Sequence, residues 1–428
     1  MPNNKIPNIR FKGFNQEWEE AKLSTKFDFD VPHNSLSRDK LNNENGEVQD
    51  IHYGDILIKY GSVVDAHKDK IPYITNSNES DYASERLADG DIIFADTAED
   101  ETAGKAIEIQ NTQSNCVVAG LHTIVARPNT EFSSNYLGHC LNSASFHSKM
   151  IPLLQGIKVL SISKSTLADL SFSFPSDRSE QQKIGSFFRA LDELIAAKEE
   201  ELEKLRQLKA ALLEQMFPQS DADTTNRGGC NVLIINQLDK SNMTISTAPN
   251  TPRIRFKGFT EPWEKSQLKK EVDYTSTGVR ACDISSNGKY DLYDANDIIG
   301  KVNTYASDKP YISIIKDGAG VGRVRLLPES TNVLGTMGVI SPKGENDINF
   351  IFSHIQNKDF KQHIISGAIP HVYFKNYGED EILIPLPAEQ QKIGNFFREQ
   401  DEVICASADN ITKLKTIKQA LLQKMFAA

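Results

Sequence analysis

The chain repeats two short sequence blocks at two different offsets. Residues 9–14 read IRFKGF and return at 254–259, which is 245 positions later. Residues 180–185 read EQQKIG and return at 389–394, which is only 209 positions later. The long segments between the blocks show little similarity to each other. A repeated frame around different inserts is suited to holding two different recognition surfaces in one geometry, and it dictates the fold more strongly than any single motif.

Composition predicts a soluble protein of the cytoplasm. At 428 residues the chain is long enough for two or three domains, and 39% hydrophobic with 25% charged residues is ordinary for a globular protein. We find no apolar run long enough to span a membrane and no signal peptide. The five cysteines are odd in number and form no C-x-x-C pair, which predicts reduced thiols without disulfides or a zinc site.

The net charge of −10 is concentrated in one part of the chain. Residues 19–179 carry 14 basic and 24 acidic side chains, and the rest of the chain is balanced. Residues 79–108 hold ten acids against only Arg86 and Lys105. Phosphates would repel so acidic a segment, so we expect it to face water or a basic protein partner.

The pattern of strands, turns and helices predicts two mixed α/β domains. We expect strands at 55–60, 91–95, 122–126 and 311–315, and helices at 134–150 and 349–365. Each domain ends in an apolar strand, a proline and a long helix, as expected where proline occupies a helix start. The predicted order is a leading segment at 1–18, a first domain at 19–176, a first long helix at 177–217, a linker at 218–250, a second leading segment at 251–263, a second domain at 264–386 and a second long helix at 387–428.

The two long helices carry a matching apolar seam. Alternating steps of four and three give eight apolar positions of ten in the first helix and seven of ten in the second. A seam of period 3.5 predicts a coiled coil, about 57 Å long for 38 residues. Lys209 and Lys418 occupy equivalent seam positions, a polar defect of the kind that sets register and orientation. The apolar seam residues are Ile184, Phe188, Leu191, Ile195, Leu202, Leu205, Leu212, Met216, Ile393, Phe397, Ile404, Ile411, Leu414, Leu421 and Met425.

The linker is polar, with 232–235 as its only apolar run, and we predict disorder there.

The sequence does not support a catalytic motif. The glycines of 318–322 lack the context of a phosphate loop, and a β-turn explains them better. The acids of 96–101 fit a solvated loop better than a metal cluster, and the histidines lack ligand spacing. We therefore expect neither catalysis nor a metal site on this chain.

The ordered, doubled motifs resemble the specificity subunits of Type I restriction-modification systems. The resemblance rests on the two leading motifs with Trp18 and Trp263, on the proline-then-EQQKI start of each helix, and on the helix ends at 211–217 and 420–426. It implies two α/β (α+β) target recognition domains in pseudo-two-fold arrangement, separated by an antiparallel coiled coil of the two long helices. The second domain is 36 residues shorter, which leaves open whether it keeps every element.

By the same resemblance, the chain is a non-catalytic reader of double-stranded DNA. Each domain would read one half of a split, asymmetric sequence, and the helices would fix the gap. The helix seam would dock two methyltransferase subunits that use S-adenosylmethionine to methylate adenine, and restriction subunits with ATP and Mg²⁺ would complete a site-specific deoxyribonuclease.

DNA contacts are expected in the loops before each closing strand and in one further basic group. Basic and hydroxyl side chains there can contact phosphates or base edges, although a solvated surface charge explains any one of them equally well. The candidates are Lys158, Ser161, Ser163, Lys164, Lys316, Arg323, Arg325, His371, Tyr373 and Lys375. The rival hypothesis is a protein–protein adaptor with a coiled-coil spacer, which the acidic segment favours slightly.

Overall fold

The computed structural model describes residues 5–218, 242–246, 250–367 and 369–427. Most of the linker at 218–250, for which disorder is predicted, lies outside these residues, including its apolar run at 232–235; the prediction is wrong for Met243–Ile245, which form a strand paired with Ile254–Phe256. The chain divides into two compact units, one of residues 1–199 with 409–428 and the other of residues 200–408. Among the described helices, none combines the length and the apolar character that crossing a membrane requires.

The first unit contains two larger sheets and two strand pairs. Its five-stranded sheet has the order β2 (Phe27–Asp28), β11 (Thr123–Pro128), β7 (Ile92–Ala95), β9 (Ala106–Gln110) and β5 (Val63–Asp65). Its four-stranded sheet has the order β10 (Cys116–Ala119), β4 (Val48–Ile51), β6 (Tyr73–Ile74) and β3 (Leu41–Asn42). The pairs are β1 (Glu19–Lys22) with β13 (Ser171–Phe174), and β8 (Thr97–Ala98) with β12 (Leu160–Ser161).

Two predicted elements of this unit are wrong. The expected strand at 55–60 is the helix α2 (Tyr53–Ile58), which begins where the His52 side chain accepts a hydrogen bond from Gly54 N–H. The expected helix at 134–150 is two short helices, α3 (Leu137–Leu141) and α4 (Ala144–Met150). Ser143 separates them, because its side chain caps the start of α4 by accepting from Phe146 N–H. The other short helices of the unit are α1 (Leu23–Lys26) and α5 (Lys164–Asp169).

The second unit repeats this plan, with fewer strands among its described residues. Its main sheet has the order β17 (Val272–Ser276), β23 (Met337–Pro342), β20 (Tyr311–Ile315) and β21 (Val324–Leu327). Its second sheet has the order β19 (Ile298–Val302), β18 (Tyr290–Tyr293) and β22 (Asn332–Val333). The strand pairs are β16 (Glu264–Gln267) with β24 (Glu381–Ile384), and β14 (Met243–Ile245) with β15 (Ile254–Phe256). Among the described residues, the short α-helices of this unit are α8 (Leu268–Glu271), α9 (Ile348–Gln356) and α10 (Phe374–Tyr377). The helix expected over 349–365 therefore ends at Gln356.

The two domains therefore share a topology that their sequences do not reveal. The order β2, β11, β7, β9 in one sheet matches β17, β23, β20, β21 in the other, with antiparallel neighbours throughout. Each second sheet also contains one parallel pair, β4 with β10 and β18 with β22. Within the described residues, β5 has no counterpart in the second domain. The shorter domain keeps the central sheet and loses an edge.

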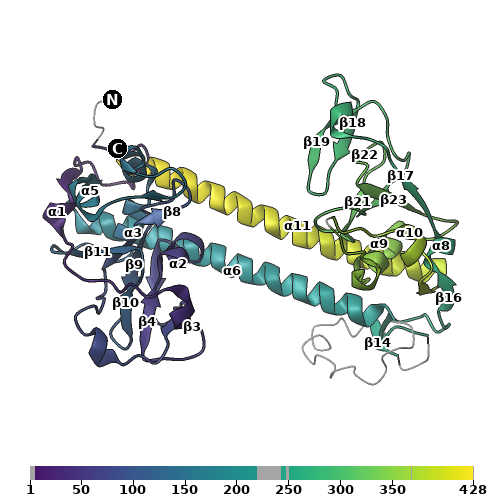
Figure 1. Ribbon diagram of the computed structural model, residues 1–428, viewed down its shortest axis with the longest axis horizontal. Coiled ribbons are helices and arrows are strands. Elements are labelled where there is room, and N and C mark those ends of the chain that lie inside the picture. Colours follow the sequence, from purple (N-terminus) through teal and green to yellow (C-terminus); the bar gives the residue numbers. More distant parts are fainter. Residues whose placement is uncertain (1–4, 219–241, 247–249, 368, 428) are drawn as a thin grey trace. The chain divides into compact units, whose positions relative to one another are not determined.

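The long helices α6 (Arg178–Met216) and α11 (Pro387–Lys424) each contribute to both units (Figure 1). In the first unit the start of α6 lies against the end of α11, and in the second unit the start of α11 lies against the end of α6. The pairing is thus antiparallel. Each predicted seam residue is buried or half-buried.

The end of each long helix completes the core of the unit that it enters. Phe426, just after α11, packs on Trp18, Tyr136 and Phe188 in the first core. Phe217, just after α6, packs on Trp263, Phe350 and Phe397 in the second core. Burying a large aromatic side chain in this way holds each helix end firmly in place.

Candidate functional site

An arginine–glutamate pair joins each leading segment to a long helix. The Arg10 guanidinium donates two bonds to the Glu180 carboxylate, at 2.6 and 2.7 Å. Arg255 binds Glu389 in the same way, at 2.7 and 2.8 Å. Both glutamates are only 1% exposed, and the bond to Glu180 raises the pKa of Arg10. A bidentate pair fixes direction as well as distance, so the leading motif orients the helix start.

The first glutamine of each EQQKIG block ties the helix to the domain that precedes it. Gln181 accepts a bond from Ser133 N–H at 3.0 Å and donates to the carbonyl of Pro175 at 2.8 Å. Gln390 makes the matching pair of bonds, with Asp347 N–H and with the Pro385 carbonyl. One amide side chain therefore connects three segments in each unit.

The glycine of each block allows a close approach between helix and domain. A Cβ atom on Gly185 would lie 2.8 Å from the Ser134 carbonyl oxygen, and one on Gly394 would lie 2.2 Å from Asp347 Oδ1. Neither distance is compatible with a larger side chain. The repeated block is thus a joint that fixes each α/β domain to the long helix that follows it.

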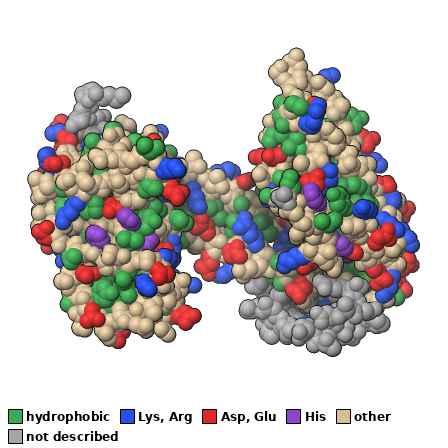
Figure 2. All heavy atoms as spheres, viewed as in Figure 1, with side chains coloured by type: hydrophobic (Ala, Val, Ile, Leu, Met, Phe, Trp, Pro, Cys, Tyr) green, Lys and Arg blue, Asp and Glu red, His purple; other side chains and the backbone are tan. Residues whose placement is uncertain are grey.

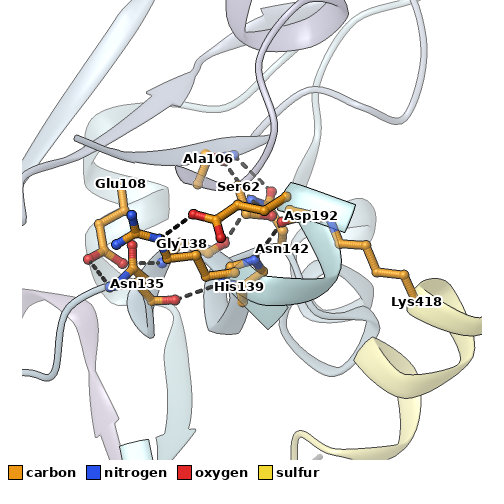
Figure 3. A network of polar contacts seen from close by, with 11 residues as sticks. Ser62, Ala106, Glu108, Asn135, Gly138, His139, Asn142, Asp192 and Lys418 are labelled. Carbon is orange, nitrogen blue, oxygen red and sulfur yellow. Dashed lines mark hydrogen bonds and ion pairs between the residues drawn. The ribbon is translucent and has the colours of Figure 1, made fainter. Parts of the chain in front are cut away.

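A second joint in the first unit is a polar network centred on Asp192 of α6 (Figure 3). Lys418 of α11 binds Asp192 at 2.5 Å, and His139 Nε2 of α3 lies 2.9 Å from the same carboxylate. His139 is fully buried, and its Nδ1 lies 2.7 Å from the Asn135 carbonyl. The ring therefore lies between a backbone carbonyl of its own domain and a carboxylate of α6.

The surroundings of this network are also charged and buried. Burial acts to raise the pKa of Asp192, but His139 and Lys418 outweigh it and hold that pKa below its usual range. Glu108 of β9 accepts bonds from Asn135 N–H at 2.6 Å and from Gly138 N–H at 2.9 Å, while burial raises its pKa. The network thus links a strand and a helix of the first domain to both long helices.

The second unit has the matching joint with a different third member. Lys209 of α6 is 7% exposed and binds Asp401 of α11 at 2.6 Å. Its other partner is Gln356 of α9, whose Oε1 lies 2.7 Å from the Lys209 ammonium nitrogen. The two seam lysines predicted as polar defects are therefore paired reciprocally with equivalent aspartates.

The candidate loop of the first domain is closed by Gln155 and Ser161. These residues exchange two backbone hydrogen bonds, at 2.9 and 2.8 Å, and Lys158 is exposed on the loop between them. Ser163 caps α5 by accepting from Thr166 N–H, which gives this hydroxyl a structural role. Lys164 lies 3.8 Å from Asp30.

The candidate loop of the second domain is closed in the same way. Ile365 and His371 exchange two backbone hydrogen bonds, at 2.9 and 3.1 Å. The His371 ring stacks on Tyr373, and Lys375 lies over the Tyr373 ring. Lys316 joins this group through Asp317, which contacts both Lys316 and His371. The structure thus brings four of the predicted residues of this domain together.

The remaining candidates, Arg323 and Arg325, lie in a separate group. Arg323 donates to the Ala295 carbonyl and to Asn296 Oδ1, and Arg325 donates to the Asn296 carbonyl at 2.7 Å. Both arginines hold the turn between β18 and β19. On the face drawn in Figure 2, basic and acidic side chains are interspersed over the described surface.

Two kinds of residue were not predicted from the sequence. Asp192 and Asp401 were missed because they lie beside the apolar seam. The two aspartates are 209 positions apart, the same offset as the two EQQKIG blocks, so this offset could have identified them. The exposed aliphatic tips of the two loops form the other kind: Ile157 is 100% exposed and Ile369 is 55% exposed. Among the described residues, no group of three or more His, Cys, Asp or Glu side chains could hold a metal ion.

Comparisons with known proteins point to one family. The Type I restriction modification DNA specificity domain matches residues 39–207 and 260–418, together more than half of the chain. The solved S subunit of a Type I restriction-modification system from M. genitalium has a similar fold, with a TM-score of 0.60, 17% identity, and coverage of 98% of this chain and 99% of that one. A structure described for complex assembly and conformational transition of the type I R-M system has a TM-score of 0.52 at 12% identity, covering 95% of this chain and 96% of that one. No curated protein matches the chain in sequence.

Proposed function

We propose that this chain, which belongs to the Type I restriction-modification DNA specificity family, reads a two-part DNA sequence with a fixed gap. The observation that carries the proposal is that the same contacts hold the two long helices in both units. In each unit an arginine of the leading segment binds a glutamate at the start of one long helix (Arg10–Glu180 and Arg255–Glu389), and a lysine near the end of the other long helix binds an aspartate of the first (Lys418–Asp192 and Lys209–Asp401). Two linked readers bind two half-sites with a gain in effective concentration, but only at the matching spacing.

Each domain is proposed to read one half-site through its closing loop. The loops at 156–160 and 366–370 are held by equivalent backbone bonds, whereas their side chains differ. Constant backbone with variable side chains allows one fold to read different sequences. Lys158, Ser161 and Lys164 would act in the first domain, and Lys316, His371, Tyr373 and Lys375 in the second, with phosphates or base edges as their targets.

For Ser163, Arg323 and Arg325 the structure offers a competing role. Ser163 caps a helix, and the two arginines hold the β18–β19 turn, so each has a partner inside the protein. We propose that the arginines act indirectly, by presenting this turn to DNA, and that Ser163 positions α5.

The chemistry is proposed to lie in partner subunits. The similar solved structure described for type I R-M assembly concerns a complex, and by that likeness we propose that this chain docks two methyltransferase subunits and restriction subunits along its helices. S-adenosylmethionine, ATP and Mg²⁺ would then be bound by those partners, and the complex would act on cytoplasmic DNA.

Methylation mapping tests the proposal. DNA from cells that express this chain with its cognate methyltransferase is sequenced for methyladenine, and cells that lack only this chain serve as the control. The expected result is a bipartite motif with one fixed gap that disappears in the control. A continuous motif, or a motif that persists without the chain, contradicts the proposal and favours the adaptor.

A further inference from the structure

The two candidate DNA loops rejoin their sheets through the same contact. Ile162 N–H donates to the Asp96 carbonyl at 2.9 Å, and Val372 N–H donates to the Lys316 carbonyl at 2.9 Å. Asp96 directly follows β7 and Lys316 directly follows β20, and these two strands occupy equivalent places in the main sheets of the two units. Both loops are therefore anchored at the same point of one topology.

The two loops also have the same length. Their closing pairs, 155 with 161 and 365 with 371, enclose residues 156–160 and 366–370. Positions in the first loop thus correspond to positions in the second loop that are 210 residues later. The exposure of the side chains agrees with this correspondence, since 159 and 369 are exposed, 160 and 370 are half-buried, and 162 and 372 are buried.

An aliphatic side chain is exposed at one position that the two loops share. Val159 is 48% exposed and Ile369 is 55% exposed. A single exposed aliphatic residue is common on a protein surface. Here the same position is aliphatic in both loops, although the residues two positions later, Ser161 and His371, differ. The exposed aliphatic side chain is thus a feature of the site and not of one loop alone.

The backbone beside each of these residues is fixed. Leu160 pairs with Ala98 where β12 meets β8. In the second unit the Pro370 carbonyl accepts a bond from Gly318 N–H at 2.9 Å. Valine and isoleucine are branched at Cβ, which restricts rotation about χ1. Each loop consequently presents its methyl groups with little conformational freedom left to lose on contact.

The polar neighbours of the two positions favour DNA as the contact. Lys158 and Lys164 lie on either side of the first position in sequence, and Lys316 anchors the second loop. Ammonium groups attract phosphates, while side chains such as Ser161 and His371 can form hydrogen bonds with base edges. The apolar group that a base edge offers in the major groove is the C5 methyl group of thymine. An aliphatic side chain placed among hydrogen-bonding and basic side chains suits that methyl group.

We propose that Val159 and Ile369 each contact the C5 methyl group of one thymine, Val159 in the half-site that the first domain reads and Ile369 in the other. Each residue favours thymine at one place of its half-site, because the other bases of unmodified DNA carry no methyl group there. The inference rests on the proposed function and adds to it two specificity-determining residues.

Replacing thymine by uracil tests the contact without altering the protein. The full chain in complex with methyltransferase subunits is titrated with duplexes of the motif found by methylation mapping, in which one thymine at a time is replaced by deoxyuridine. Deoxyuridine lacks the methyl group and keeps the hydrogen bonds of thymine. We expect one position in each half-site where the replacement weakens binding about three- to fourfold, which is the effect of losing one buried methyl group. A half-site in which no position responds overturns the proposal.

Alanine variants assign each response to its residue. Val159→Ala is expected to abolish the uracil response in one half-site and to keep it in the other, and Ile369→Ala is expected to do the reverse. Both side chains are exposed, so both variants should fold. Each variant is thereby the matched control for the other. A uracil response that survives in both half-sites of either variant overturns the proposal.

Ile157→Ala is a control within the first loop. Ile157 is 100% exposed, but its counterpart in the second loop is Gly367, so the two loops share no aliphatic side chain at this position. This variant should keep the uracil response in both half-sites. Loss of either response in Ile157→Ala contradicts the assignment to Val159.

Failure of the proposed function gives a different result. If the complex binds the motif no more tightly than a duplex without it, the chain does not read DNA and both proposals fall. If the complex binds the motif but shows no uracil response, only the thymine contact is refuted.

Discussion

At the scale of single residues, the ion pair of Arg255 and Glu389 explains why the leading motif and the helix motif recur together. The leading motif and the helix motif lie far apart in sequence, yet their arginine and glutamate meet in both units. The sequence showed that the motifs recur together, but it could not show that they bind each other. Pairing between distant segments depends on the complete fold, whereas helix and strand patterns are local.

Removing Arg255 is expected to destabilise the second unit strongly. Arg255→Ala leaves the Glu389 carboxylate buried without its partner, which costs about 3–5 kcal/mol in the free energy of unfolding. The control is Lys269→Ala, since Lys269 and Glu379 form a largely exposed pair whose loss costs less than about 1 kcal/mol. Chemical denaturation of the full chain checks both values, and equal losses would contradict a structural role for the Arg255 pair.

His354 is expected to make the second unit sensitive to acid. Burial lowers the pKa of His354 from 6.5 to about 4, and the nearby Lys358 adds to this effect. Between these pH values the unfolded chain binds a proton that the folded protein excludes, so stability falls as the pH drops from 6.5 towards 4. The full effect is about 3 kcal/mol at the lower end.

Replacing this histidine tests the sign of that effect. Nδ1 of His354 is buried without a hydrogen-bond partner among the described residues, so His354→Phe removes no bond at that atom. Unfolding measured from pH 7 to pH 4 is expected to show a shallower loss of stability in this variant. His33→Phe, at an exposed position, should keep the original slope. A steeper slope in His354→Phe would show that the ring is not buried in its neutral form.

At the scale of elements, the apolar seam of the long helices could be predicted from the sequence. Of the polar pairs beside it, only the lysines were predicted. The 3.5-residue period identified both helices and the lysine in each. The aspartates opposite were missed because a seam pattern is defined by apolar residues. Short elements were harder: the run at 55–60 has the residues of a strand but forms α2, because the His52 cap and the neighbouring sheets decide its conformation.

The two lysine–aspartate pairs select one register of the helices. Lys209 faces Asp401, and Lys418 faces Asp192. A slip of one heptad would place Lys209 opposite residue 394 or 408, a glycine or an alanine, and would leave its charge buried without a partner. Burying an unpaired charge is costly, so the slipped register is disfavoured.

A charge swap tests this role. Lys209→Asp is expected to lower the free energy of unfolding by about 1–3 kcal/mol, a range reduced because Asp401 is 40% exposed. Adding Asp401→Lys should recover more than half of the loss. Lys415→Asp, at the exposed pair with Glu199, serves as the control and should cost less than about 1 kcal/mol. If the double variant is no more stable than Lys209→Asp alone, the pair does not set the register.

At the scale of the whole molecule, the repeat predicted the frame and left the inserts open. Repetition of motifs is visible in sequence, so the two domains and two helices could be expected from it. The shared topology of the inserts could not be expected from the sequence, because different side chains can form the same order of strands in a sheet. The candidate DNA loops lie at equivalent places in both domains, but the side chains that contact DNA remain a proposal.

The central claim is that the helices set the gap and the domains set the half-sites. Inserting one heptad into both helices, between Glu199 and Glu200 and between Ala408 and Asp409, preserves the seam and lengthens each helix by about 10.5 Å. At 3.4 Å per base pair this corresponds to about three base pairs. Insertion into α6 alone prevents the Lys209–Asp401 and Lys418–Asp192 pairs from forming at the same time, and it should abolish methylation.

Methyladenine mapping of cells that carry the doubly lengthened chain is the most direct measurement. The account predicts the two half-sites of the original motif, unchanged in sequence, separated by a gap longer by about three base pairs. An unchanged gap in an active variant, or altered half-sites, would contradict it.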